Sequence, residues 1–270
     1  MSEDFGLFGP GSVTWRVMGE PVLFVGGFRA LLLQALHPPT MWGTAQNSEL
    51  MDPATARARL ARTIAFVRVR TYGTTEEVDR IGRRVRNLHS RLSGTNPDTG
   101  EAFRVDKPEN LLWVHMGEVD SYLDVAVRSG VGLSREQADR FVDEQRKAAA
   151  VVGLDPADVP ASVAEMRDYY TGMRPGLWAC KEAKDGLWRM FNPAAPLPLK
   201  LAAPSIASLV VATLPRWARR MYGLPATPLE DLAATATLKA LYRGTHVIPA
   251  QLRYSPEAKR ARALTKQHAA

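Results

Sequence analysis

The sequence has few of the residues and motifs on which common protein sites depend. Its one cysteine, Cys180, cannot form a disulfide within the chain, and one thiol is too few for a cysteine-based zinc site or an iron–sulfur cluster. His-Glu-x-x-His, Gly-x-Ser-x-Gly, Gly-x-Gly-x-x-Gly and the P-loop pattern are all absent. The usual motifs of zinc proteases, α/β-hydrolases, dinucleotide-binding domains and P-loop NTPases are therefore missing.

Long apolar runs are also lacking. The longest apolar stretch, Pro21 to Leu36, is interrupted by two glycines and Arg29, and this pattern favours a buried helix over a membrane span. The first eleven residues carry Glu3 and Asp4 but no basic region, unlike a secretory signal. We therefore expect a cytoplasmic protein without a signal peptide or transmembrane helix, at most peripheral to a membrane.

The composition is that of a globular protein. The chain has 270 residues, of which 46% are hydrophobic and 23% are charged, enough to bury one large core. The formal net charge is +7, but the basic residues are dispersed and form no single block, so no nucleic-acid partner is expected. The basic tail from Pro256 onward is interpreted as a solvated face, with weak membrane-surface contact as the alternative.

Helical periodicity runs through the chain, and alternating strand patterns are nearly absent. The segment Asn192 to Pro204 contains four prolines and is expected to be a long connection. The predicted fold class is all-α, a single multi-helix globular domain over residues 1–270. The expected helices span residues 12–18, 21–36, 53–70, 75–92, 108–129, 134–151, 160–172, 175–191, 199–212, 214–222, 228–241 and 255–267.

The expected helix over 75–92, with Thr75 as its N-cap, places a histidine among apolar residues. His89 falls within the apolar stripe, while arginines occupy the other side. An imidazole there needs a hydrogen-bond partner or a metal, because burying it alone is costly. His89 is therefore either a core histidine with a partner or a neutral imidazole presented to iron. The stripe comprises Val78, Ile81, Val85, Leu88 and Leu92.

The expected helix over 53–70, with Asp52 as its N-cap, carries arginines on its apolar side. Arg59 and Arg70 share the inward face, and Arg62 lies at its margin. A guanidinium in that position must reach the surface or pair with an anion. The anion could be a buried carboxylate, a carboxylate ligand or a haem propionate. The rest of that face comprises Ala56, Leu60, Thr63, Ile64, Phe66 and Val67.

Two more histidines lie in apolar surroundings. His115 shares one side of the expected helix over 108–129 with Glu118 and Tyr122, and is either a pocket base or a core histidine bonded to Glu118. A di-iron bundle site is excluded, because it needs Glu-x-x-His twice and the sequence has none. His37 ends the helix that begins at Pro21, where it either bonds free carbonyls or lines a pocket.

Five short motifs follow one another along the chain. They are Gln34-x-x-His37-Pro38, Arg59-x-x-Arg62-Thr63, Tyr72-Gly73-Thr74, Val85-Arg86-x-x-His89 and Leu112-Trp113-Val114-His115. Their order and spacing resemble the MpaB/rubber-oxygenase family, which includes the latex clearing proteins. The resemblance covers about residues 9–224 and leaves the C-terminal helices and basic tail, residues 225–270, outside it.

This resemblance implies an all-α fold that holds haem b non-covalently, with His89 in the position of the proximal iron ligand. The rubber-cleaving members have an Arg-x-x-Lys-Thr segment near the distal side, and its arginine and threonine correspond to Arg59 and Thr63. Its lysine, which can occupy the sixth iron position in a closed state, is replaced by Arg62. Because arginine stays protonated, it is a very poor iron ligand. The distal site should thus be open, water-bound or capped by another group, such as His37 or His115.

The resemblance also assigns roles to the inward residues. Arg59, Arg62, Arg70 and His37 are expected to bind the cofactor beside His89, with the guanidiniums pairing with propionates. Arg59 and Thr63 are expected to order dioxygen through hydrogen bonds, and His115 joins them if it is the pocket base and not a core histidine bonded to Glu118. These residues are expected to serve catalysis.

The expected function is a haem-dependent oxygenase that uses dioxygen on a hydrophobic small molecule. Related enzymes cleave carbon–carbon double bonds of isoprenoid chains, which makes an isoprenoid substrate the leading hypothesis. Two alternatives differ in class. A haem-binding sensor or carrier would show a haem spectrum without consuming oxygen, whereas a metal-free helical ligand-binding protein would be colourless.

Overall fold

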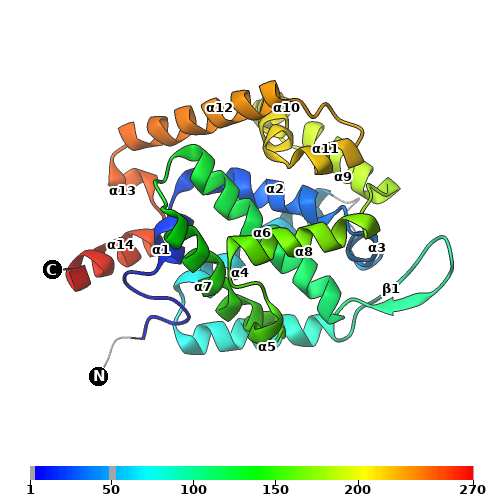
Figure 1. Ribbon diagram of the computed structural model, residues 1–270, viewed down its shortest axis with the longest axis horizontal. Coiled ribbons are helices and arrows are strands. Elements are labelled where there is room, and N and C mark those ends of the chain that lie inside the picture. The colour runs from blue at the N-terminus through cyan, green and yellow to red at the C-terminus, as the bar shows by residue number, and fades with distance from the viewer. Residues whose placement is uncertain (1–3, 49–52, 270) are drawn as a thin grey trace.

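The computed structural model describes residues 4–48 and 53–269, and nearly all of its regular structure is helical, as predicted. The long helix α6 (Pro108–Ser129) crosses the middle of the molecule, and the other helices pack around it (Figure 1). Short 3-10 helices span Pro21–Leu23, Pro156–Asp158 and Arg174–Gly176. The other α-helices described are α1 (Val13–Met18), α2 (Phe24–Gln34), α3 (Pro38–Gln46), α4 (Pro53–Tyr72), α5 (Thr75–His89), α7 (Arg135–Val152), α8 (Val163–Met173), α9 (Lys181–Phe191), α10 (Leu197–Thr213), α11 (Arg216–Met221), α12 (Pro228–Val247), α13 (Ala250–Arg253) and α14 (Pro256–Ala269).

The centre of the core is the contact between α6 and α2. Trp113 and Met116 of α6 are completely buried in the principal cluster of apolar side chains. Glycines let the two helices approach closely: a Cβ on Gly117 would lie 2.9 Å from the Cγ atom of Gln34. The helix predicted over 108–129 has the predicted bounds, because its apolar side chains continue for six turns before Gly130 ends it with a left-handed conformation.

A buried ionic cluster fastens α2 to α6 and α10. Arg29, which interrupts the apolar stretch Pro21 to Leu36, is 2% exposed and belongs to this cluster. Its Nη1 atom donates to Asp120 Oδ2 and to Ser121 Oγ, each at 2.7 Å, and its Nε atom donates to the carbonyl of Thr213 at 3.1 Å. This cluster replaces the water that the guanidinium loses on burial.

The predicted connection over Asn192 to Pro204 is wrong, because α10 begins at Leu197 and continues through Pro204. Pro196 is the N-cap and Pro198 lies in the first turn, where helical N–H groups have no intrahelical partner. Pro204 lies inside the helix and removes one backbone hydrogen bond. Four prolines therefore did not prevent a helix, since two of them suit its start.

Other differences from the predicted elements are local. The helix expected over 21–36 is divided into the 3-10 turn Pro21–Leu23 and α2, and the short helix α3 was not predicted. A small antiparallel hairpin, β1 (Ser93–Thr95) and β2 (Ala102–Arg104), was also missed. The predicted N-cap Asp52 lies outside the described residues.

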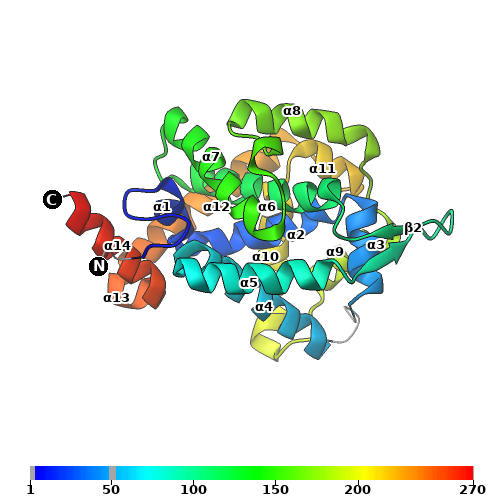
Figure 2. The ribbon, with the colours of Figure 1, turned by 90° about the horizontal axis from the view of Figure 1, so that it is seen from below.

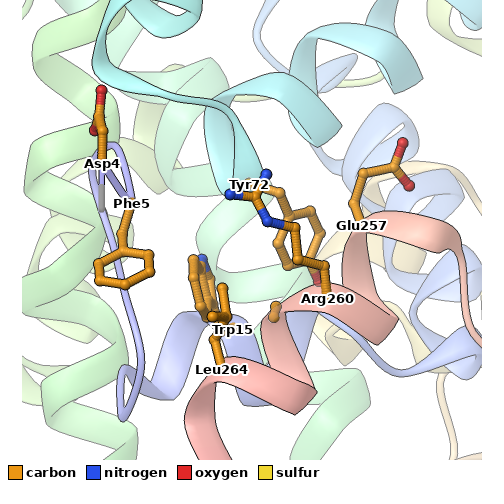
Figure 3. A pocket seen from close by; sticks show the side chains of 8 residues that line it. Asp4, Phe5, Trp15, Tyr72, Glu257, Arg260 and Leu264 are labelled. Atoms are coloured by element: carbon orange, nitrogen blue, oxygen red, sulfur yellow. The ribbon is translucent and has the colours of Figure 1, made fainter. Parts of the chain in front are cut away.

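Helices α4 and α5 form a layer on one side of the molecule (Figure 2). They pack against each other, α4 also contacts α1 and α14, and α5 contacts α7. None of their described side chains belongs to the principal core cluster, although Val78 is buried. Ile64 is 50% exposed and Leu88 is 55% exposed, so part of the apolar surface of this layer is open to solvent. No described helix has the length and hydropathy needed to cross a membrane.

Candidate functional site

The turn between α4 and α5 brings Arg59 and His89 to the same end of this layer. Thr74, and not the predicted Thr75, caps α5: its side chain accepts from the Glu77 N–H, and the Glu77 carboxylate accepts from the Thr74 N–H. Gly73 is needed before it, because a Cβ there would lie 2.6 Å from the carbonyl oxygen of Val69. The two helices then run antiparallel for similar lengths, so His89 at the end of α5 returns to the level of Arg59.

His89 has an unpaired ring nitrogen. It is the last residue of α5 and is half-buried, and its Nδ1 atom is shielded from solvent without a hydrogen-bond partner in the described part of the chain. Burial lowers the pKa of His89; Asp106 raises it and the nearby Arg59 guanidinium lowers it further. The imidazole is therefore neutral near pH 7, and its Nδ1 atom is free to accept a partner that the described residues do not supply.

Arg59 and Thr63 lie one turn apart on α4. Arg59 Nη1 donates to the hydroxyl of Ser48, and burial lowers the Arg59 pKa, as does the charge of Arg62. The Thr63 hydroxyl donates to the Arg59 carbonyl at 3.1 Å, and its side chain is exposed, as is that of Ile64, although both were expected on an inward face. Arg62 is also exposed.

Arg70 pairs with a carboxylate, whereas the partner described for Arg59 is a hydroxyl. It is 4% exposed and forms a two-point ion pair with Glu118 of α6: Nη1 donates to Oε2 at 3.1 Å and Nη2 donates to Oε1. Of the three anions considered for this arginine, the structure contains the buried carboxylate. A contact between Arg70 and a cofactor stays a prediction.

His115 lies in the same part of the core and is 3% exposed. Burial, and then the charge of Arg70, lower its pKa to about 4, so the ring is neutral at pH 7. The expected hydrogen bond to Glu118 is not formed among the described residues, since that carboxylate is taken by Arg70. The His115 Nε2 atom is buried without a partner there.

His37 is not in the last turn of a helix, and the interpretation that it bonds free carbonyls is wrong. It is the N-cap of α3, and its Nδ1 atom is 2.8 Å from the hydroxyl of Thr40. Burial lowers its pKa to about 4. Its ring lies 5.9 Å from that of Trp113, whose indole N–H donates to the Gln34 carbonyl at 2.9 Å. The first and fifth sequence motifs therefore meet where α2 and α6 cross.

The candidate site therefore contains neutral imidazoles and buried guanidiniums and does not resemble a cluster of metal ligands. No group of three or more histidine, cysteine or acidic side chains in the described ranges is placed to hold a metal ion. A porphyrin itself supplies four iron ligands, so a haem site needs only one protein nitrogen. His89, with its unpaired nitrogen, fits that requirement.

A comparison with protein families identifies the family of the chain. The family model described as the catalytic domain of ER-bound oxygenase mpaB/B′/rubber oxygenase matches residues 15–246. The chain belongs to this family. The match confirms the family predicted from the sequence motifs, includes all five of them, and extends into α12, which the sequence analysis left outside. No curated protein and no solved structure matches the chain significantly.

Membership of the mpaB/rubber-oxygenase family supports an oxygenase activity in general terms, with a substrate and oxygen as its reactants. Sequence reasoning did not predict the buried ion pair between Arg29 and Asp120. Their signal was present, because a charged residue in an apolar helix requires an opposite charge on a neighbouring helix. The sequence alone does not show which of several carboxylates supplies it.

Proposed function

We propose that this chain binds haem b through His89 and uses dioxygen to oxidise a lipophilic small molecule. The observation that carries the proposal is the buried, unpaired Nδ1 atom of a neutral imidazole at the end of α5. A buried polar atom without a partner is uncommon in a folded protein and requires an explanation. Iron ligation would supply one, since it gives the unpaired ring nitrogen a strong interaction.

The helices that carry Arg59 and His89 have side chains that suit a large apolar group with anionic edges. Leu60, Ile64 and Leu88 belong to helices whose described apolar residues stay outside the principal core, so a porphyrin could give them a partner. Arg59 supplies a cation close enough to lower the pKa of His89. A guanidinium has five N–H donors, and among the described residues the bond to Ser48 leaves others to bind a propionate or an oxygen atom.

When bound, haem would supply the activation of dioxygen. The chain's own residues would prepare the site for it. Burial keeps His89 neutral, so its lone pair is available without the loss of a proton. Because the Thr63 hydroxyl donates its hydrogen to the Arg59 carbonyl, its oxygen remains as an acceptor at the site. Arg59 would attract and orient electron-rich groups.

The proposed substrate class is lipophilic, and an isoprenoid chain whose double bond is cleaved oxidatively is the leading candidate. Support comes from the family of oxygenase domains and from the exposed apolar side chains of α4 and α5. Arg62 stands in the position where rubber-cleaving members have a lysine. A lysine-capped resting state is therefore not part of the proposal.

The test combines a spectrum with oxygen consumption. Protein expressed with added haem should show a Soret band and consume oxygen when given an isoprenoid lipid. Arg59→Ala should lower turnover by about 100-fold while the band persists, and Arg80→Ala, an exposed arginine of α5, should leave turnover unchanged. A Soret band without any substrate-dependent oxygen consumption would indicate a non-catalytic haem protein, and no band would favour a metal-free ligand-binding protein.

A further inference from the structure

The amino-terminal end of α10 is largely apolar, and its residues 197–202 are all exposed. We call residues 197–202 the α10 tip. Its three leucines are 67%, 53% and 71% exposed at positions Leu197, Leu199 and Leu201. Helical spacing of 100° per residue puts Leu199 roughly opposite the other two. Helices that are apolar all round normally lie in a protein core or in lipid, so the α10 tip lacks its usual surroundings.

The charged residues on either side of the α10 tip in the sequence are basic. The chain has no acidic residue anywhere between Asp185 and Glu230. Lys200 is exposed within the tip, and the net charge of the whole chain is +7. Trp188 of α9, shortly before the tip in sequence, is 63% exposed. Exposed leucines beside a tryptophan and a lysine are typical of segments that enter the boundary between lipid headgroups and acyl chains.

The α10 tip lies beside the helix that carries the candidate site. The connection that precedes it is bonded to α4, because Arg57 Nη1 donates to the Ala194 carbonyl at 3.2 Å. Figure 2 shows this half of α10 next to the start of α4, at the edge of the molecule away from α8 and α11. A molecule that leaves a bilayer at the tip would therefore reach the helix of Arg59 by a short path.

We propose that the α10 tip inserts into the surface of an anionic lipid bilayer, and that the lipophilic substrate enters from there. The second clause rests on the function proposed above, whereas the first stands on the tip itself. Lipid is favoured over a second copy of the chain because acyl chains can surround a protruding apolar tip, while a protein partner covers one face. Lys200 would meet the lipid phosphates.

The experiment measures co-sedimentation with vesicles of phosphatidylcholine, alone or mixed with phosphatidylglycerol. The wild-type protein should bind the mixed vesicles more tightly. The double variant L199D/L201D should lower binding to both kinds by about tenfold or more, because two apolar side chains lose their transfer into lipid. Lys200→Glu should weaken binding to the mixed vesicles alone. Leu229→Asp, an equally exposed leucine at the start of α12, should bind like wild type.

Equal binding by L199D/L201D and wild type, or no binding of wild type to either vesicle, would overturn the proposal. A wild-type dimer in light scattering that the double variant converts to a monomer would also overturn it and assign the tip to a second copy. The circular dichroism and Soret band of the double variant should equal those of wild type. If the wild-type protein binds lipid but does not bind haem, the proposed function is refuted and the proposed lipid-binding surface is retained.

Discussion

At the residue scale, burial decides the charge of the histidines that matter. His37 and His115 have pKa values lowered to about 4, and His89 is shifted in the same direction. In each, desolvation is the largest cause. Neutral rings are available as hydrogen-bond acceptors or as ligands, and the fold must keep protons away from them. The protein should therefore lose stability in acid.

The free energy of unfolding should fall as the pH is lowered from about 6.5 to about 4. Over this window the unfolded chain protonates both imidazoles, while the folded chain keeps His37 and His115 neutral. Each can contribute up to about 3 kcal/mol of this loss, with none added below about pH 4. Urea unfolding at several pH values measures it. His115→Gln should make the dependence shallower; identical slopes for wild type and His115→Gln would contradict the assignment.

Removing one partner of the ion pair between Arg70 and Glu118 should strongly lower the stability of the fold. Glu118→Gln should lower the free energy of unfolding by about 3 kcal/mol, because a guanidinium that is 4% exposed is left without its counter-charge. Glu76→Gln removes the exposed partner of Arg80 and should change stability by less than about 0.5 kcal/mol. Denaturant titration compares the two. Equal losses of stability in Glu118→Gln and Glu76→Gln would show that removing a partner of the buried pair costs no more than removing one of an exposed pair.

At the element scale, the sequence predicts what depends on local periodicity. The stretch that became α6 carries a helical pattern and a glycine at its end, and its bounds were predicted without error. The start of α10 was misread because proline frequency alone does not distinguish the first helical turn from a loop. The hairpin after His89 was missed because its strands have three residues each, too few for an alternating pattern.

The candidate site could be predicted in its residue types but not in its partners. The inclusion of His89 in an apolar stripe and the placement of arginines on α4 follow from spacing. That Glu118 pairs with Arg70, leaving His115 without it, depends on how α4 crosses α6. Thr63 was expected to face inward and is exposed, because the α4–α5 layer is not covered by the principal core.

Gly73→Ala should disturb the turn that sets His89 opposite Arg59. Its Cβ would lie 2.6 Å from the Val69 carbonyl, so α4 and α5 must shift, at a cost of about 1–3 kcal/mol. Haem affinity should fall in the same variant. Gly172→Ala on α8, where a Cβ meets open space, should instead stabilise by about 0.5–1 kcal/mol. Thermal unfolding and haem titration read both effects, and an unaltered haem affinity in Gly73→Ala would show that the turn does not position the site.

At the scale of the whole molecule, the α2–α6 core and the α4–α5 layer are packed differently. In the core, Trp113 and the Arg29 cluster are buried, whereas the layer carries exposed apolar side chains such as Ile64 and Leu88. A ligand that covers the exposed apolar side chains of the layer would bind only the folded chain and so stabilise it. Both the haem and the lipid proposals place an apolar partner on this side of the protein.

Haem should therefore raise the thermal midpoint of the wild-type protein. At a free concentration about 100 times its Kd, a ligand specific for the folded state adds about 2.7 kcal/mol, which corresponds to several degrees for a chain of this size. His89→Ala should show a much smaller rise. Calorimetry with and without haem measures the difference, and an equal rise in both proteins would indicate haem binding elsewhere.

The most direct measurement is the absorption and electron paramagnetic resonance spectrum of haem-loaded protein with and without His89. We predict a Soret band in wild type and in His246→Ala, and its loss or a marked shift in His89→Ala. In His89→Gly, added imidazole should restore the wild-type spectrum, because it can occupy the space left by the ring. A spectrum in His89→Ala with the same intensity, position and iron signal as wild type would contradict the assignment of His89 as the iron ligand.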